Sequence, residues 1–417
     1  MKRLLAVCWE MPPLSGPRAV QVTRTLAALP EYGWQSQVIC FGPRSDRYQQ
    51  DYHVSLEELS GGHASRIPVA SPEEWLVFRA LWRLAPPLKQ LPDEKRVWMP
   101  GALRAARRAV DAQRPDVLLT FAQPWSDHLI GLRLRRESAL PWVAHFSDPW
   151  VDSPYFRAPQ WVRRRAEQWE RDVVSAATRV VFVSSRTRDR VMAKYPSAWT
   201  AKTDVIPQAY EPGNAVGAME PPTRRDRPMR MVYTGRFYDG IRTPDRLLAA
   251  LASIHRTSPL PGQLAVEFVG SDMARYQARV AELGLQDVVS FAGRVPPVEA
   301  RARAATADVL LVIDAPDSSG SIFQPSKLIE YLPARRPIFG VTPAVGPSAD
   351  LLRELGYHVV DPDDVTGIAE GLRALLRLHT AGRLVASLQH DSVAERFSVA
   401  TTSRSFAAVL ERAMEAR

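Results

Sequence analysis

The sequence has little cysteine and lacks any long apolar run. Its two cysteines, Cys8 and Cys40, both fall in predicted core strands, which indicates buried free thiols of a cytosolic protein. No apolar stretch approaches the ~18–20 residues that a membrane-spanning helix needs. The apolar start, residues 1–8, resembles the first half of a signal peptide. Because Trp9, Glu10 and two prolines end it early, a first β-strand is favoured.

Two kinds of binding signature are also missing. No cluster of cysteine and histidine has the spacing of metal ligands. The arginines are scattered over predicted helices, and no recognised nucleic-acid-binding signature is present. The net charge of +9 therefore favours phosphorylated ligands or an anionic membrane over nucleic acid.

Apolar strands alternate with helices twice along the 417 residues, which are too many for one ordinary core. In the first half the predicted strands are 4–9, 37–41, 117–121, 141–146, 179–183 and 204–207. In the second half they are 231–235, 265–270, 288–293, 307–313, 337–341 and 357–360. The pattern predicts an α/β fold with two Rossmann-like domains that face a central ligand-binding cleft.

A segment rich in proline, glycine and charge marks the expected boundary between the domains. We predict a first domain over 1–213, a linker over 214–229 and a second domain over 230–392. An amphipathic C-terminal helix within 393–417 is expected to cross back to the first domain.

The stretch Ser321–Leu332 follows a buried strand and a small polar loop, and Pro325 opens a short helix there. A helix that begins after such a loop presents backbone N–H groups to a phosphate. Lys327 and Glu330 share one face of its first turn, so that one offers a cation and the other a carboxylate for sugar hydroxyls. The alternative is an exposed Lys–Glu helix pair.

Three residues of the first half lie where α/β sheets place ligand contacts. Gly16 follows the first strand and permits close approach of a ligand or of the backbone, and it is equally consistent with an ordinary turn. His145 and Asp148 lie in the polar cluster that ends the strand segment 141–150, a position that favours a functional over a purely structural histidine.

Residues 43–100 are irregular, and this region is where an acceptor or lipid site could be built. Trp75, Phe78, Leu81 and Trp82 recur at helical spacing, which favours core packing over a membrane face. The helix 159–177 carries Arg163–Arg165. Its charged face is interpreted first as solvated, with contact to anionic lipid as the alternative.

The motifs of the second half resemble those of retaining GT-B glycosyltransferases of family four. Gly235-Arg236-Phe237, with Arg242 six residues after Arg236, resembles the family's phosphate-clamping segment, Gly-Arg-(five residues)-Lys-Gly. Residues 289–295 resemble its base-binding strand, and 327–332 its donor-ribose segment. The resemblance covers most of the chain except 43–100.

By this resemblance the enzyme takes a sugar from a nucleotide-diphosphate donor and keeps its anomeric configuration. Growing charge on the leaving diphosphate needs stabilisation, and arginines with backbone N–H groups from Gly320 to Ser326 supply it. No divalent metal and no cofactor are implied beyond the nucleotide-sugar co-substrate. The residues that the resemblance assigns to catalysis are Arg236, Arg242, His145 and Asp148. Those assigned to donor binding are Gly16, Gly235, Gly293, Arg294, Val295, Ser319, Gly320, Ser321, Ser326, Lys327, Leu328 and Glu330.

The chain departs from the family pattern at several positions. Ile322 stands where a second glutamate is usual, eight residues before Glu330, with Asp317 or the backbone of 319–321 as substitutes. Arg242 replaces the usual lysine, which keeps the charge but changes the hydrogen-bond geometry. Asp361-x-Asp363 imitates the metal-binding pair of the other glycosyltransferase fold, and its place in a late turn discounts it.

The leading hypothesis is a retaining sugar transferase that acts on a saccharide or lipid-linked acceptor in bacterial surface polysaccharide or glycolipid assembly. The alternatives are a GT-B epimerase of UDP-sugars and a non-catalytic nucleotide-sugar-binding subunit. We expect a cytoplasmic location, with peripheral contact at the inner face of the membrane as a further hypothesis, and no nucleic-acid partner.

Overall fold

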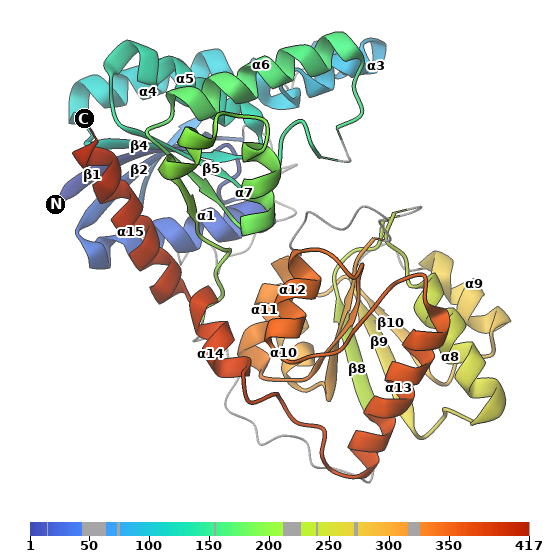
Figure 1. The fold of residues 1–417 in the computed structure, drawn as a ribbon. Helices are drawn as coiled ribbons and strands as arrows, with labels where there is room; N and C mark the ends of the chain where they lie inside the picture. Colours follow the sequence, from blue (N-terminus) through green and yellow to red (C-terminus); the bar gives the residue numbers. More distant parts are fainter. Residues whose placement is uncertain are drawn as a thin grey trace. The chain divides into compact units, whose positions relative to one another are not determined.

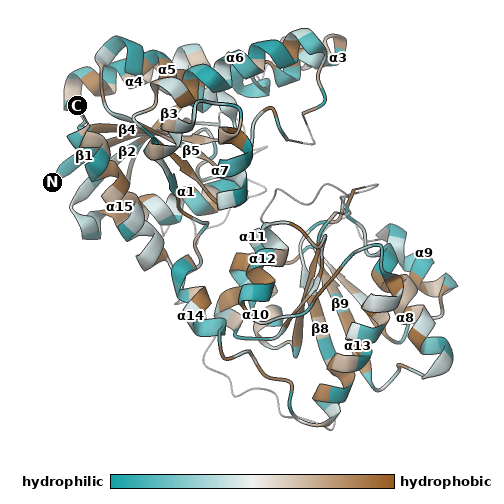
Figure 2. Cartoon of the chain, viewed as in Figure 1, coloured by the Kyte–Doolittle hydropathy of each residue, from teal (hydrophilic) through white to brown (hydrophobic). Residues whose placement is uncertain are grey.

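The computed structural model describes residues 1–14, 16–43, 64–72, 76–153, 156–211, 227–238, 241–270, 274–315 and 326–416. The chain forms two compact units, each built on a parallel sheet with helices on both faces (Figure 1). One unit comprises Met1–Ala209 with Val399–Arg417, and the other comprises Tyr210–Ser398. In both sheets the strands are mainly apolar, whereas the outer faces of the helices are largely hydrophilic (Figure 2).

The first unit contains a seven-stranded sheet in the order β3-β2-β1-β4-β5-β6-β7. Its strands are β1 (Lys2–Val7), β2 (Trp34–Phe41), β3 (Ala64–Val69), β4 (Val117–Ala122), β5 (Trp142–Phe146), β6 (Arg179–Phe182) and β7 (Thr203–Val205). Its main helices are α1 (Pro17–Ala28), α3 (Leu76–Leu84), α4 (Met99–Gln113), α5 (Trp125–Ser138), α6 (Gln160–Ala176), α7 (Ser185–Met192) and α15 (Val399–Glu415). Apolar residues of α1 and α15 pack in one core cluster, and those of α4, α5 and α6 pack in the other.

The second unit contains a six-stranded sheet in the order β10-β9-β8-β11-β12-β13. Its strands are β8 (Met229–Thr234), β9 (Leu264–Val269), β10 (Val289–Gly293), β11 (Val309–Ile313), β12 (Ile338–Val341) and β13 (Val359–Val360). Its helices are α8 (Asp245–Thr257), α9 (Ala274–Glu282), α10 (Pro297–Ala305), α11 (Ser326–Tyr331), α12 (Pro347–Glu354), α13 (Val365–Thr380) and α14 (His390–Ala394). The strand order reverses between β8 and β11 here, and between β1 and β4 in the first unit.

The C-terminal helix α15 belongs to the first unit, as predicted. Phe406 is 2% exposed and packs with the apolar residues of α1 and the sheet. Lys2 pairs with Glu411 at 2.5 Å, and Arg412 pairs with Asp204 at 2.8 Å. The last helix in the described chain therefore packs against the sheet that the first 205 residues form.

One strand was missed by the sequence analysis. β3 lies at the edge of the first sheet, where it pairs only with β2. Its sequence mixes Arg66 and Pro68 with apolar residues, and proline is tolerated in edge strands because no ladder hydrogen bond is lost there. The first unit's leading segment ends at Ala209, where 213 was predicted. Most of the predicted linker, residues 214–226, lies outside the described residues.

Most tryptophans lie in the core of the first unit and not on a lipid-facing surface. The buried ones are Trp9, Trp34, Trp82, Trp98, Trp125, Trp142 and Trp150. Trp82 of α3 is 7% exposed and lies under the guanidinium of Arg96, which agrees with core packing at that position. Trp75 and the side chain of Leu81 lie outside the described residues.

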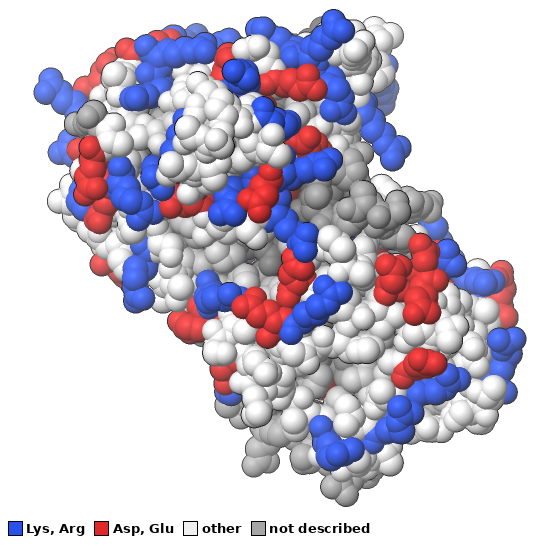
Figure 3. Space-filling model, in the orientation of Figure 1, with Lys and Arg blue, Asp and Glu red and all other residues white. Residues whose placement is uncertain are grey.

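Arginines of the first unit gather over its outer helices, interspersed with acidic side chains (Figure 3). On α6, Arg163 turns inward and donates to the carbonyl oxygens of Val151 and Phe156 at 2.9 and 3.1 Å. Trp161 of the same helix is 54% exposed. Among the described residues, the helices are too short or too polar to cross a bilayer.

Candidate functional site

The second sheet places a group of polar side chains at the carboxyl ends of β8 and β11, where its strand order reverses. Ligands of open α/β sheets bind at such switch points. Gly235 follows β8 with a φ of +136°, a conformation that side chains disfavour. A Cβ atom here would lie 3.1 Å from Nζ of Lys327, so glycine also leaves room for the lysine.

The loop after Gly235 folds back on itself. Phe237 is buried and stacks on Tyr233 with ring centroids 4.6 Å apart, which anchors the loop in the core. Backbone hydrogen bonds in both directions join Tyr238 and Arg242. As a result a guanidinium nitrogen of Arg242 donates to the carbonyl oxygen of Arg236 at 3.0 Å. The guanidinium of Arg242 is thus held against the backbone of Arg236, whose side chain is exposed.

Helix α11 brings Lys327 to the same place. The Tyr331 hydroxyl accepts a hydrogen bond from the backbone N–H of Thr234 at 2.8 Å, which ties α11 to the end of β8. One turn earlier, Nζ of Lys327 lies 2.5 Å from the Tyr233 hydroxyl and 3.8 Å from the centroid of that ring. Lys327 is therefore held in place by the hydroxyl and ring of Tyr233.

Burial and the nearby charge of Arg242 hold the pKa of Lys327 well below its ordinary value. The neighbouring carboxylate is Asp314, which follows β11, is 5% exposed and accepts from Thr342 Oγ1 at 3.0 Å. Burial raises the pKa of Asp314, and the two cations oppose that shift. Nε of Arg242 is buried without a hydrogen-bond partner among the described residues. The group is thus cation-rich, and an anion would stabilise it.

The other described residues predicted to bind the donor lie at the end of β10 and on α11. Gly293 has a φ of +69° at the end of the edge strand β10, and exposed Arg294 and partly buried Val295 follow it. On α11, Ser326 and Glu330 are partly exposed, whereas Leu328 is fully buried in the core. Leu328 can thus contribute its backbone but not its side chain. Ser319, Gly320 and Ser321, together with Asp317 and Ile322, lie outside the described residues.

His145 is enclosed in the first unit, which corrects the expectation that it contacts the donor sugar. Its ring is 0% exposed and lies between Phe121 and Phe406, with centroid distances of 5.3 and 5.6 Å. Neither ring nitrogen has a partner among the described residues, and burial holds the pKa well below its ordinary value. The alternation along β5 turns this side chain to the face that α15 covers. We therefore assign His145 to the core.

Asp148 and Gly16 lie at the carboxyl edge of the first sheet. Asp148 is partly buried and accepts a 3.4 Å hydrogen bond from Gln123, and burial raises its pKa. A Cβ atom on Gly16 would lie 1.7 Å from Oε1 of Glu10. The space at Gly16 is thus occupied by a carboxylate of the protein, which also accepts from the backbone N–H of Ala19 in the first turn of α1.

Several residues that lie at these sheet edges were not predicted from the sequence to belong to a site. Asp314 and Tyr233 were included in predicted segments or their ends without a role. Arg18 is 9% exposed and donates to Gln21 at 2.7 Å, and burial lowers its pKa while Asp148 and Glu10 oppose that shift. A charged residue at the first turn of a helix gives little indication of such burial. Only the position directly after a strand could have drawn attention to Asp314.

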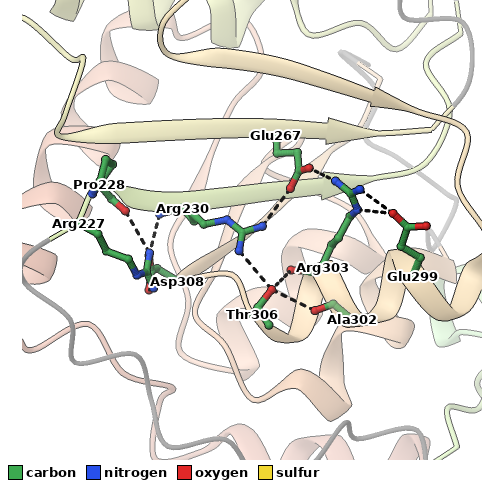
Figure 4. A network of polar contacts seen from close by, with 9 residues as sticks. All are labelled: Arg227, Pro228, Arg230, Glu267, Glu299, Ala302, Arg303, Thr306 and Asp308. Carbon is green, nitrogen blue, oxygen red and sulfur yellow. Dashed lines mark hydrogen bonds and ion pairs between the residues drawn. The ribbon is translucent and has the colours of Figure 1, made fainter.

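The amino ends of the second sheet carry a different polar network, shown in Figure 4. Glu267 of β9 pairs with Arg230 of β8 at 3.1 Å and with Arg303 of α10. Asp308 accepts from both terminal nitrogens of Arg227, at 2.7 and 2.8 Å. Arg303 also pairs with Glu299 at 2.6 Å, so the three arginines of this network face three carboxylates.

The described residues contain no group of three or more side chains suited to hold a metal ion. The pair Asp361 and Asp363 has structural contacts. A carboxylate oxygen of Asp361 accepts from the backbone N–H of Asp363 at 3.0 Å, and Asp363 pairs with Arg246 at 3.0 Å. These contacts agree with the interpretation of the segment as a turn.

A family model and several solved structures match this chain. Residues 18–209 match the family model of a glycosyl transferase 4-like domain. No curated protein matches the sequence. The structure of sucrose-phosphate synthase from Thermosynechococcus elongatus matches with a TM-score of 0.72 at 17% identity, over 100% of both chains.

Two further structures extend the likeness. WaaG, a glycosyltransferase involved in lipopolysaccharide biosynthesis, matches with a TM-score of 0.58 at 13% identity, over 99% of this chain and 98% of that one. A mutant of S. aureus TarM in complex with Fondaparinux, alpha-GlcNAc-glycerol and UDP matches with a TM-score of 0.64 at 8% identity, over 98% and 100%. Residues 18–209 therefore match a glycosyl transferase 4-like domain, and the whole chain has the GT-B fold.

Proposed function

We propose that the protein is a retaining, metal-independent transferase that moves a sugar from a nucleotide-diphosphate donor to a saccharide or lipid-linked acceptor. The observation that carries the proposal is the excess of cations at the β8–β11 switch point. Lys327 and Arg242 are close enough to influence one another, and Asp314 is the carboxylate that acts on both. A diphosphate would supply the missing negative charge.

The chemistry follows from that charge. As the bond between the sugar and the diphosphate breaks, negative charge grows on the phosphate oxygens. Fixed cations in a partly desolvated site stabilise this charge more than they stabilise the ground state. Arg236, Arg242 and Lys327 are the residues proposed to do so, with Glu330 on the ribose. A contact between Asp148 and the donor sugar remains part of the proposal. A contact between His145 and that sugar does not.

The cellular role is proposed by analogy. WaaG is involved in lipopolysaccharide biosynthesis by its description, and TarM was solved with UDP. A role in bacterial surface polysaccharide or glycolipid assembly and a UDP-sugar donor agree with these relatives. Peripheral contact with anionic membrane would involve exposed Trp161 and the exposed arginines beside it on α6. Flotation with anionic vesicles at low salt tests this part separately.

A thermal-shift panel of UDP-, GDP- and dTDP-sugars tests the donor site, because a ligand that binds the native state raises its melting temperature. The variant Arg242→Ala should lose most of the shift. Arg246→Ala is the matched control, because it removes an arginine of the same unit whose side chain is 56% exposed. An equal shift in wild type and Arg242→Ala would refute the clamp.

A further inference from the structure

The strands β8 and β11 separate at the switch point of the second sheet. Their pairing ends at Val232 and Leu310. Each strand nevertheless continues beside its other neighbour, β8 as far as Thr234 and β11 as far as Ile313. The next hydrogen bond of a parallel ladder in this register would join the backbone N–H of Thr234 to the carbonyl oxygen of Leu311. The two strands therefore part before either of them ends.

The hydroxyl group of Tyr331 lies where that hydrogen bond would form. It accepts from the backbone N–H of Thr234 at 2.8 Å and from Thr234 Oγ1 at 3.2 Å, and it donates to the carbonyl oxygen of Leu311 at 3.4 Å. A tyrosine hydroxyl has one proton and two lone pairs, so these contacts use its whole capacity. The hydroxyl is thus inserted between the strands and replaces a direct contact of their backbones.

Burial fixes the ring that carries this hydroxyl. Tyr331 is 1% exposed and packs in one core cluster with Leu328 and Ile329 of the same helix. Burial also raises the pKa of Tyr331 to about 12, so the hydroxyl keeps the proton that it donates. The hydroxyl of Tyr331 is therefore a spacer of fixed position between β8 and β11.

The two strand ends that the spacer separates lead directly to the charged group described above. Gly235 follows Thr234, and Asp314 is the third residue after Leu311. The distance between the strand ends therefore contributes to the distance between the turn after β8 and the carboxyl group of Asp314. Loss of the spacer would move these groups relative to each other.

The ammonium group of Lys327 is linked to the same turn. Lys327 lies one turn before Tyr331 on α11, so the two side chains share a face of that helix. Its Nζ donates to the Tyr233 hydroxyl, and that hydroxyl donates to the carbonyl oxygen of Arg236 at 3.3 Å. The same carbonyl oxygen accepts from a guanidinium nitrogen of Arg242 at 3.0 Å. A chain of hydrogen bonds thus joins the two cations through the turn that follows the spacer.

Cations stabilise a diphosphate best when their spacing is fixed before the ligand binds, because no reorganisation is then required. Resting on the function proposed above, we propose that Tyr331 is a positioning residue that holds β8 and β11 apart and thereby sets the spacing of Lys327 and Arg242 for the diphosphate. Without the hydroxyl, the backbone groups of Thr234 and Leu311 bond to each other or lose a partner. Either change displaces the turn after β8.

Calorimetry with UDP, GDP and dTDP tests the proposal in Tyr331→Phe, which keeps the ring and removes the hydroxyl. The nucleotide that wild-type protein binds most tightly should bind this variant about tenfold more weakly. Tyr357→Phe is the matched control, because it removes a hydroxyl of the same unit that also accepts from a backbone N–H, that of Ser387 at 3.3 Å. The control should keep the wild-type affinity.

A second measurement needs no ligand. Nε of Arg242 is buried, and its N–H signal in NMR of nitrogen-labelled protein is assigned by its loss in Arg242→Ala. Because Arg242 belongs to the turn after β8, this signal should shift in Tyr331→Phe and keep its position in Tyr357→Phe. A loss of stability alone would leave it in place in both variants.

Three results would overturn the proposal. They are equal nucleotide affinity in wild type and Tyr331→Phe, a loss of affinity in Tyr357→Phe as large as that in Tyr331→Phe, and an Arg242 signal that Tyr331→Phe leaves unchanged. If wild-type protein binds none of the three nucleotides, the proposed transferase function fails, and the Arg242 signal alone then decides whether Tyr331 positions the turn.

Discussion

The two sheets reverse their strand order in the same way, yet the glycine that follows the first strand of each unit lies beside side chains of opposite charge. In the first unit, the carboxylate of Glu10 occupies the space beside Gly16 and accepts from the first turn of α1. In the second unit, the space beside Gly235 is occupied by the ammonium group of Lys327, with Arg242 close by. Buried Arg18 lies among several carboxyl groups in the first unit, whereas Lys327 and Arg242 share Asp314 in the second. The first group therefore has an excess of carboxyl groups, and the second has an excess of cations.

This difference bears on the charge of the ligand that each unit attracts. The glycine serves the same steric purpose in both turns, since it makes room for a long charged side chain. The sign of that side chain then decides whether a phosphate is attracted or repelled. This difference in charge agrees with the proposal that the donor diphosphate binds to the second unit.

The largest expected effect on nucleotide binding comes from removal of the Lys327 cation of α11, beside Gly235. Lys327→Met should weaken binding of the nucleotide sugar that the thermal-shift panel identifies by about 100-fold, which corresponds to about 2.8 kcal/mol. Because the half-buried ammonium group is costly to desolvate, the melting temperature without ligand should stay equal or rise. Isothermal calorimetry and thermal unfolding measure the two quantities. A stable variant with unchanged affinity would contradict the role of Lys327.

Replacement of each of the two glycines by alanine tests the comparison further. Gly16→Ala should displace Glu10 and destabilise the protein by about 1–3 kcal/mol without change in nucleotide affinity. Gly235→Ala introduces a Cβ atom at a φ of +136° and beside Lys327, so it should lower nucleotide affinity about tenfold in addition to a similar loss of stability. Denaturant unfolding and calorimetry separate the effects. If Gly16→Ala also weakened nucleotide binding, the proposal that the donor binds beside Gly235 in the second unit would be wrong.

The lowered pKa of Lys327 predicts that donor binding takes up a proton. Between that lowered pKa and the ordinary value near 10.5, free protein has Lys327 partly neutral, and a bound diphosphate favours the charged form. Calorimetry of a nucleotide sugar at pH 8 to 9 should thus give binding enthalpies that differ between buffers of different ionisation enthalpy. Lys327→Met should abolish the difference; an undiminished difference in that variant would assign the proton to another group.

The smallest effect on sugar transfer is expected from replacement of His145. Its folded pKa is lowered, so its contribution to stability is present above pH 6.5 and is lost as the pH falls below 6.5, by up to about 1.4 kcal/mol per pH unit. His145→Phe should remove this dependence and leave sugar transfer unchanged. His128, whose pKa burial lowers to about 3, retains its own share of the pH dependence. A large loss of transfer in a well-folded His145→Phe protein would restore the original catalytic assignment.

Much of the fold could be predicted because buried parallel strands such as β4 and β11 are nearly continuous apolar runs. The edge strand β3 was missed because its charged and proline residues give no such run. Among candidate site residues, the glycine and arginine motif of the second unit indicated the positions of Gly235 and Arg242. His145 could not be assigned correctly, because its burial depends on Phe406, a residue 261 positions later.

The return of α15 to the first unit has a consequence for the order of folding during synthesis. Domains generally fold as units while the chain emerges, the N-terminal one first. Here Phe406, Val409 and Leu410 belong to a core cluster of the first unit, so that unit can close only after these residues have left the ribosome. Residues 210–398 form a contiguous unit and can close earlier. The half that is translated first is therefore expected to be the last to complete its core.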